Sequence, residues 1–266
     1  MSLPSVAFVP GDSWLHKLDP RVKLGFALLA AMALLSLGNL LVFFSCLVLC
    51  HVLLLSAKVP TSRLLWAWRM MLPITIMIPL LWPLFSTSEG TLALRLGPVA
   101  VTWDSVWQGL AAALRVDALA FAFLVWLFTT DQDAMVLGFR RLGLPYTWGV
   151  TLAITLRYIP TIHMTLERVL DAQRARGLVT SYTNPLRAAY SYLPALVPVL
   201  ILALRTVENL SRALEARAFN APGRVRTSRK QLHLTTRDAL FLAATALGFG
   251  GLILARVMWD WGATPL

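Results

Sequence analysis

The feature that most constrains the fold is one apolar block, which covers residues 21–57. A single helix of that length, at a rise of about 1.5 Å per residue, would be nearly twice as long as the roughly 30 Å hydrocarbon core of a bilayer. Gly38 and Asn39 lie near the middle of the block, and such a dipeptide is typical of turns. The block therefore predicts a helical hairpin that crosses a membrane, with helices over about 21–37 and 39–57.

Later segments predict three more membrane-crossing helices, over about 68–85, 105–130 and 238–259. The first of these contains Pro73, Pro79 and Pro83, which membrane bundles tolerate because neighbouring groups satisfy the freed backbone. The second carries Arg115 and Asp117, which we expect near its outer end, where long side chains can reach the interface.

The loops between the spans carry the charges that set their side of the membrane. Cytoplasmic loops are enriched in Lys and Arg, and such residues occur before the first helix and after the second, at Lys17, Arg21, Lys23, Lys58, Arg63 and Arg69. We therefore expect a multi-pass protein whose N-terminus is cytoplasmic and is not a cleavable signal peptide. The segment 86–104 carries more acidic than basic residues, as we expect of a loop on the outer side. Its sequence predicts two short extended pieces around Gly97 and Pro98.

The composition agrees with a membrane protein and argues against a nucleic-acid partner. Of the residues, 58% are hydrophobic and 14% are charged, whereas soluble domains carry about 25% charged residues. The net charge of +11 is spread between the apolar runs rather than gathered in one tract. We attribute this charge to the cytoplasmic excess of Lys and Arg and to attraction to the lipid bilayer.

The region 131–236 has a different character, because it mixes apolar stretches with many charges. Its cleanest apolar stretch, residues 190–204, contains Pro194 and Pro198. This pattern predicts long amphipathic helices at the cytoplasmic interface. The fold class is thus an all-α polytopic membrane protein, which we divide into an N-terminal transmembrane bundle of about four spans, a cytoplasmic or interfacial helical region and a final transmembrane helix, at residues 1–130, 131–236 and 237–266.

Two elements within this region end in an arginine. In the first, an apolar stripe runs through residues 161–177, Asp171 is spaced to pair with Arg168 and Arg174, and Gly177 suits the end of the helix. Arg176 then lies in the final turn. Such an arginine could simply offset the helix dipole, but its planar fork could also bind a carboxylate or several carbonyls of a partner.

The second element, residues 204–217, is built in the same way. Its charged face predicts ion pairs of Arg205 with Glu208, Glu208 with Arg212 and Arg212 with Glu215, and the residues Asn220, Pro222 and Gly223 stop the helix just after Arg217. Two similar elements on one side of the membrane suggest a docking surface for a cytosolic protein.

At these residues the chain resembles the transmembrane T component of energy-coupling factor (ECF) transporters, the CbiQ/EcfT-like family. Ala175, Arg176 and Gly177 match the Ala-Arg-Gly motif that ends one coupling helix of that family. Ala216 and Arg217 match the second motif, whereas Ala218 replaces its glycine, so Gly223 is the candidate for ending that helix. The opening PGDSWLHKLDPRVKL, residues 10–24, is also similar to the opening of this family.

The resemblance implies a subunit that transmits force and catalyses nothing itself. A pair of cytosolic ABC-type ATPases would move the coupling helices, and these would topple a membrane-embedded, substrate-binding S component that takes up a vitamin or a transition metal. The ATPases would dock at Ala175, Arg176, Gly177, Ala216, Arg217 and Ala218. The resemblance implies no cofactor and places the protein in the prokaryotic cell (inner) membrane.

Two other classes of protein fit the sequence less well. Against a membrane enzyme, the histidines lack metal-binding spacing, and no P-loop occurs. Asp12 and Asp19 are interpreted as solvated or capping acids, and Cys46 and Cys50 as small buried hydrophobes rather than a zinc site. The alternative is a self-contained secondary transporter or channel, for which Arg115 and Asp117 are the one close ionisable pair near a span.

Overall fold

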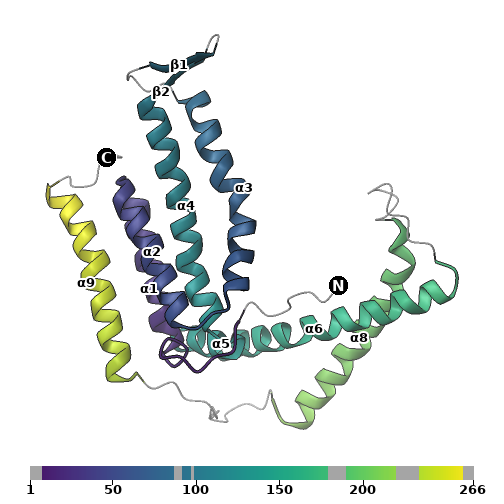
Figure 1. Ribbon diagram of the computed structural model, residues 1–266. Coiled ribbons are helices and arrows are strands. Elements are labelled where there is room, and N and C mark those ends of the chain that lie inside the picture. Colours follow the sequence, from purple (N-terminus) through teal and green to yellow (C-terminus); the bar gives the residue numbers. More distant parts are fainter. Residues whose placement is uncertain (1–7, 87–91, 97–98, 179–189, 220–233, 260–266) are drawn as a thin grey trace. The chain divides into compact units, whose positions relative to one another are not determined.

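The apolar block folds into two helices, as its length and its Gly-Asn dipeptide predict (Figure 1). They are α1, Pro20–Ser36, and α2, Leu40–Ser56. Asp19 caps α1 by accepting a hydrogen bond of 2.9 Å from the backbone N–H of Arg21. Asn39 caps α2 in the same way, so each helix begins at a side chain that satisfies a free backbone donor.

The computed structural model describes residues 8–86, 92–96, 99–178, 190–219 and 234–259.

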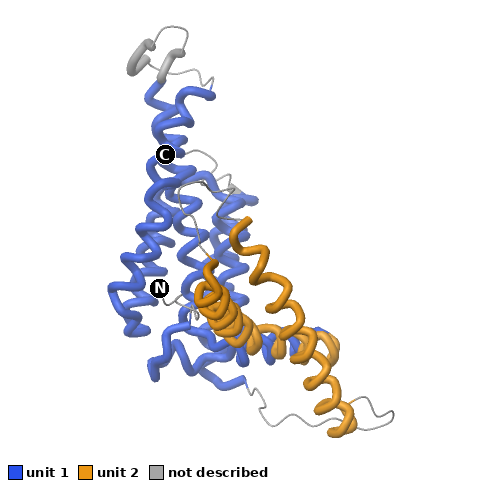
Figure 2. Tube along the Cα trace, turned by 90° about the vertical axis from the view of Figure 1, so that its right-hand side faces the viewer, with its two compact units in different colours: residues 1–144, 232–266 blue, residues 145–231 orange. Residues whose placement is uncertain are grey.

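The described chain divides into two compact units, residues 1–144 with 232–266 and residues 145–231 (Figure 2). Besides α1 and α2, the first unit contains α3, Thr61–Phe85; β1, Leu92–Leu96; β2, Val99–Thr102; α4, Trp103–Thr129; α5, Gln132–Arg141; and α9, Thr236–Trp259. The antiparallel pair β1–β2 confirms the two extended pieces that the sequence predicts. α3 begins at Thr61, directly after Pro60 and earlier than the expected start near residue 68. Arg63 and Arg69 give this part of the sequence the composition of a basic loop, although it is helical.

α4 is the central helix of the first unit, since it packs against α1, α2 and α3, while α5 and α9 pack against α1. The contact with α3 is close at Gly109, where an added Cβ would lie 3.0 Å from the Cβ of Trp82 and 3.1 Å from the Cα of Pro79. A small residue such as Gly109 lets two membrane helices approach each other closely.

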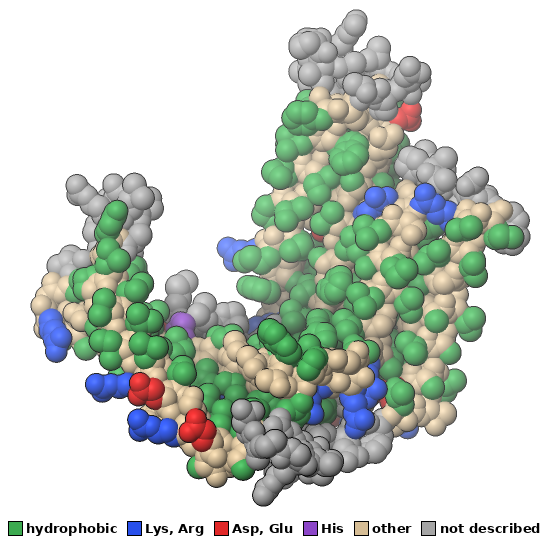
Figure 3. Space-filling model, turned by 180° about the vertical axis from the view of Figure 1, so that it is seen from behind, with side chains coloured by type: hydrophobic (Ala, Val, Ile, Leu, Met, Phe, Trp, Pro, Cys, Tyr) green, Lys and Arg blue, Asp and Glu red, His purple; other side chains and the backbone are tan. Residues whose placement is uncertain are grey.

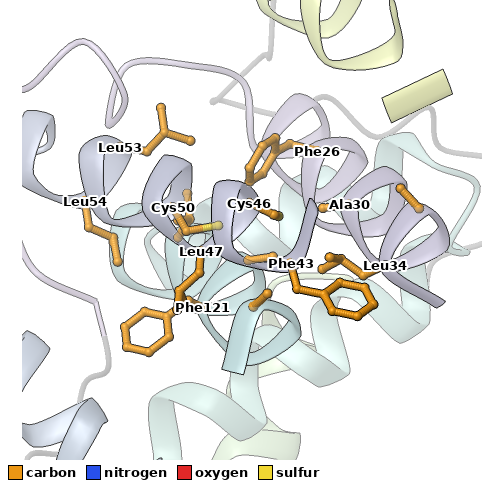
Figure 4. Packing of buried hydrophobic residues seen from close by; sticks show 14 of the residues in the cluster. Phe26, Ala30, Leu34, Phe43, Cys46, Leu47, Cys50, Leu53, Leu54 and Phe121 are labelled. Atoms are coloured by element: carbon orange, nitrogen blue, oxygen red, sulfur yellow. The ribbon is translucent and has the colours of Figure 1, made fainter. Parts of the chain in front are cut away.

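The core of this unit lies where α1, α2 and α4 meet (Figure 4). Phe26 of α1, Phe43 of α2 and Phe121 of α4 are fully buried there. Cys46 and Cys50 are buried, free thiols in the same cluster, as expected for small hydrophobes. The outer faces of the helices remain strongly apolar (Figure 3), which suits a surface that lipid covers.

Length and composition allow four of the described helices to cross a membrane, namely α3, α4, α8 and α9; α2 is apolar but shorter. The second unit contains α6, Tyr146–Ala175, and α8, Leu193–Ala216. They pack through Val169 and Leu170 of α6 and Ala195 of α8. α8 reaches the length and hydropathy of a span because its charges, from Arg205 onward, all lie in its second half and leave the first half continuously apolar. The interfacial position expected from the sequence stays a prediction.

Candidate functional site

Arg176 and Arg217 stand at the ends of the two helices of the second unit, in the same backbone conformation. α6 ends at Ala175 and α8 ends at Ala216. Arg176 has φ −91° and ψ 9°, and Arg217 has φ −91° and ψ 10°. The next residue is left-handed in both cases. We call these two helix ends, Ala175–Gly177 and Ala216–Ala218, the arginine tips.

The hydrogen bonds of the two arginine tips also correspond. After α6, the N–H of Gly177 donates to the carbonyl of Arg174, and the N–H of Leu178 to that of Gln173, both at 3.0 Å. After α8, the N–H of Ala218 donates to Glu215 at 2.8 Å, and the N–H of Phe219 donates to Leu214 at 2.9 Å. Both are Schellman motifs, which satisfy the last carbonyls of a helix and fix the direction in which the chain leaves it.

The structure corrects the expectation that Gly223 ends the second helix. Ala218 itself adopts the left-handed conformation, with φ 54°, where Gly177 has φ 92°; Gly223 lies outside the described residues. A side chain in this conformation costs roughly 1–2 kcal/mol. The ring of Phe219, the next residue, packs against the ring of Tyr146 with centroids 5.8 Å apart. This contact helps to offset the strain at Ala218.

Both arginines of the tips are exposed. Throughout the described part of the chain, neither guanidinium makes a hydrogen bond or an ion pair. Of the predicted pairs on the two helices, Asp171–Arg174 forms, at 3.1 Å. The pairs Arg168–Asp171, Arg205–Glu208, Glu208–Arg212 and Arg212–Glu215 are not within 4.0 Å in the described structure. Exposed ion pairs contribute little energy, so spacing alone did not predict which of them form.

The N-terminal opening, residues 10–24, folds into a hydrogen-bonded foot beneath the bundle. His16 is its centre: its Nδ1 shares a hydrogen bond of 2.7 Å with Ser13 Oγ, and its Nε2 lies 2.8 Å from the carbonyl oxygen of Val9. The backbone N–H of Val9 donates to the carbonyl of Phe128, at the end of α4, at 2.9 Å. Through Val9, the residue just before it, the opening is therefore linked to the end of α4.

Lys23 and Asp238 tie the first and last helices to this foot. Lys23, only 2% exposed, donates from Nζ to the carbonyl of Thr129 at 2.8 Å and to that of His16 at 3.2 Å. Asp238, at the start of α9, accepts from the backbone N–H of Asp19 at 2.8 Å. Its other oxygen accepts from the N–H and hydroxyl of Thr235. One buried polar cluster thus joins the starts of α1 and α9 to the end of α4.

Comparisons with known proteins decide the family. The family model described as "Cobalt transport protein" (CbiQ) matches residues 11–228. The chain is 30% identical over 262 residues to "Energy-coupling factor transporter transmembrane protein EcfT" of Thermosediminibacter oceani, covering 95% of this chain and 97% of that protein. It is 31% identical over 261 residues to the protein of the same name from Listeria innocua, covering 94% and 96%. The chain belongs to the CbiQ/EcfT family. The resemblance carried by the opening and the arginine motifs is therefore confirmed.

Reasoning from the sequence missed the roles of Lys23 and Asp238 in this member of the CbiQ/EcfT family. Lys23 was interpreted as an orienting charge, and Asp238 as the first residue of a span. An ionisable residue inside a span usually has a specific partner, and this signal could have identified both. The partners themselves could not be found, because Asp19 and Asp238 are 219 residues apart in the chain.

The structure also corrects the expected position of Arg115 and Asp117. Since α4 covers Trp103–Thr129, both residues lie near its midpoint rather than near its outer end. Arg115 Nη2 donates to the carbonyl of Leu37 at 2.9 Å, just after the end of α1. Asp117 is 1% exposed and accepts from the hydroxyl of Thr75, on α3, at 2.9 Å. The two residues therefore bind different neighbouring helices.

Proposed function

We propose that this chain is the transmembrane coupling subunit of an ABC-type ECF importer. In this proposal, it transmits the ATP-driven motion of a pair of cytosolic ATPases to a substrate-binding S component for uptake of a vitamin or a transition metal. Membership of the CbiQ/EcfT family supports this function. The observation that carries it is the pair of matching arginine tips, whose exposed guanidiniums have no partner in the described structure.

The geometry of the arginine tips suits force transmission. A guanidinium stays charged and offers five donors in a rigid fork, so one arginine can hold a carboxylate or several carbonyls in a partner's groove. Each fork stands at a helix end that a Schellman motif fixes, and a fixed end passes on displacement instead of absorbing it. Ala175 and Ala216, with no bulky side chains, let the partner approach the helix end closely. We place the docking of one ATPase at each tip.

The remaining parts of the proposal follow from this role. The chain would contribute no catalytic group or cofactor, because the ATPases would hydrolyse ATP. The second unit, which carries both arginine tips, would belong to the cytoplasmic or interfacial region 131–236, between the bundle 1–130 and the last helix 237–266. The basic loops favour the cytoplasmic N-terminus that this arrangement requires. Membership of the CbiQ/EcfT family supports a place in a prokaryotic inner membrane.

Co-purification from the native cell tests the proposal. Tagged wild type, Arg176→Ala, Arg217→Ala and the double variant are extracted in mild detergent, and their partners are identified by mass spectrometry. Arg168→Ala with Arg212→Ala is the matched control, because both arginines are exposed on the same two helices away from the tips. We expect two ABC-type ATPases with wild type and with the control, and loss of both with the double variant. Absence of any ATPase from wild type would refute the coupling role.

A self-contained secondary transporter or channel is the alternative, and the buried Asp117 is the observation that favours it. A carboxylate at the middle of a span often marks a path for protons or ions. Reconstitution of the chain alone into vesicles tests this alternative. Uptake by the chain alone that Asp117→Asn abolishes would support it, whereas uptake that requires the ATPases would support the coupling role.

A further inference from the structure

Two cavities of the first unit lie along α9 and meet at an aromatic pair. A pocket of about 350 Å³ is lined by Trp14, Lys17 and Leu18 of the foot and by Thr235–Asp238 at the start of α9. An apolar groove of about 500 Å³ continues along α9 from Phe241 to Leu252, with α2 on its other side. The ring of Trp14, which lines the pocket, packs edge-on against the ring of Phe241, which lines the groove, with centroids 6.0 Å apart.

The pocket carries positive charge that the described part of the protein does not neutralise. Lys17 and Arg237 line it, are both exposed, and form no ion pair with any described residue. Asp238 is the acid in its lining, but the oxygens of Asp238 already accept hydrogen bonds from Asp19 and Thr235. The buried Lys23 lies in the same charge cluster as Asp238. A phosphate group between Lys17 and Arg237 would satisfy both free cations.

The groove has the shape and chemistry of a site for an acyl chain. Arg237, Phe241, Ala244 and Gly248 recur at helical spacing, so the face of α9 that lines the pocket also lines the groove. From Phe241 to Leu252 this face is about 16 Å long at 1.5 Å per residue. Opposite it lie apolar side chains of α2 and Phe26 of α1. An added Cβ at Gly248 would meet no atom within 4 Å, which shows that the groove is open there.

We propose that the pocket and the groove together bind one anionic phospholipid. Its headgroup phosphate lies between Lys17 and Arg237, and one acyl chain fills the groove between α2 and α9. Trp14, which is 46% exposed, stands at the junction of headgroup and chain, the depth that tryptophan prefers in membranes. Basic pockets between membrane helices recognise anionic headgroups in this way. The bound lipid then fills the space between α2 and α9 and stabilises the position of α9 beside α2.

Native mass spectrometry of the purified full chain tests this site. Delipidated protein is titrated with dioleoyl phosphatidylglycerol or with dioleoyl phosphatidylcholine, and the affinity of the first bound lipid is measured. We expect phosphatidylglycerol to bind more tightly than phosphatidylcholine. In Lys17→Gln/Arg237→Gln, loss of two cations should weaken the first phosphatidylglycerol about thirtyfold. The control Arg63→Gln/Arg69→Gln removes the same charge from α3 and should bind as wild type does.

A second pair of variants tests the groove without changing charge. Gly248→Leu places a leucine side chain in the groove, while Ala246→Leu places the same side chain on the opposite face of α9. We expect Gly248→Leu to lose the tightly bound lipid and Ala246→Leu to keep it. Equal binding of the two lipids, or equal binding by the charge variant and its control, would overturn the proposal. So would displacement of the lipid by millimolar inorganic phosphate, because the site would then recognise free phosphate rather than a phospholipid.

Discussion

The ring of Tyr146, at the start of α6, packs against the ring of Phe219, which follows the end of α8, with centroids 5.8 Å apart and planes at 31°. α6 and α8 also pack through the cluster around Leu170. The two helices are therefore joined at two places, and each joint lies close to one arginine tip. Leu170 stands about two turns before Arg176, and Phe219 closely follows Arg217. In the proposed function, these joints keep the two docking points at a fixed spacing.

Removing the Phe219 ring should free the tip that carries Arg217. With spin labels at Met164 of α6 and Arg212 of α8, both exposed, and with Cys46 and Cys50 replaced by serine, double electron–electron resonance reports the distance between the helices. We expect a narrow distance distribution for the wild-type sequence and a clearly broader one for Phe219→Ala, since the aromatic pair itself contributes about 0.5–1.5 kcal/mol.

The matched control for this experiment is Tyr146→Phe, which keeps the stacked ring and should keep the narrow distribution. The co-purification assay gives a second measure, because Phe219→Ala should reduce recovery of the ATPases although Arg217 is intact. An unchanged distance distribution in Phe219→Ala would mean that the aromatic contact does not position the tip.

Substitution at the left-handed residue should destabilise one tip and leave the other unchanged or slightly more stable. Gly177→Ala places a side chain at φ 92° and should lower the free energy of unfolding by about 1 kcal/mol or more. Ala218→Gly relieves strain at φ 54°, but the greater freedom of glycine in the unfolded chain offsets part of the gain, so a small increase or no change is expected. Thermal unfolding in detergent measures both. A stabilising Gly177→Ala would contradict the shared geometry of the tips.

Lys23 should be among the most sensitive positions of the bundle. Lys23→Met removes the donor for the carbonyls of Thr129 and His16. It also leaves the buried Asp238 without the charge of Lys23, whereas Asp19 keeps Arg21 at 3.5 Å. Breaking a buried charge cluster in this way costs about 3–5 kcal/mol. Lys58→Met, the same change at an exposed lysine, is the control and should have little effect. Equal thermal stability of the two variants would show that the cluster does not stabilise the foot.

The parts of the fold that the sequence predicted are those that local physics determines. The helices α1, α2, α4 and α9 lie within a few residues of their expected ranges, because the length of an apolar run and the capping residue beside it are both local. The start of α3 was wrong because Arg63 and Arg69 were interpreted as loop residues. The hydropathy of α8 is higher than expected, because its charged residues all lie in the second half of the helix and the first half is continuously apolar.

The candidate site divides in the same way. Arg176 was placed correctly at its helix end, because Gly177 is a direct signal for a left-handed residue. Ala218 carries no such signal, and its conformation depends on the hydrogen bonds and ring contact around it. The bond between Asp19 and Asp238 joins the two ends of the chain, so no local pattern could predict it.

Two glycines in membrane-crossing helices offer a matched test of the packing around α4. At Gly109, an added methyl group would lie 3.0 Å from the Cβ of Trp82 and 3.1 Å from the backbone of Pro79, so α3 and α4 would have to separate. We expect Gly109→Ala to destabilise the bundle by about 1–3 kcal/mol, the usual cost of overpacking. At Gly248, no atom lies within 4 Å of the added methyl group. Gly248→Ala should therefore stabilise the protein by up to about 1 kcal/mol, through helix propensity alone. Thermal unfolding of the two variants in the same detergent should give shifts of opposite sign, and two shifts of the same sign would mean that the close approach of α3 to α4 does not restrict Gly109.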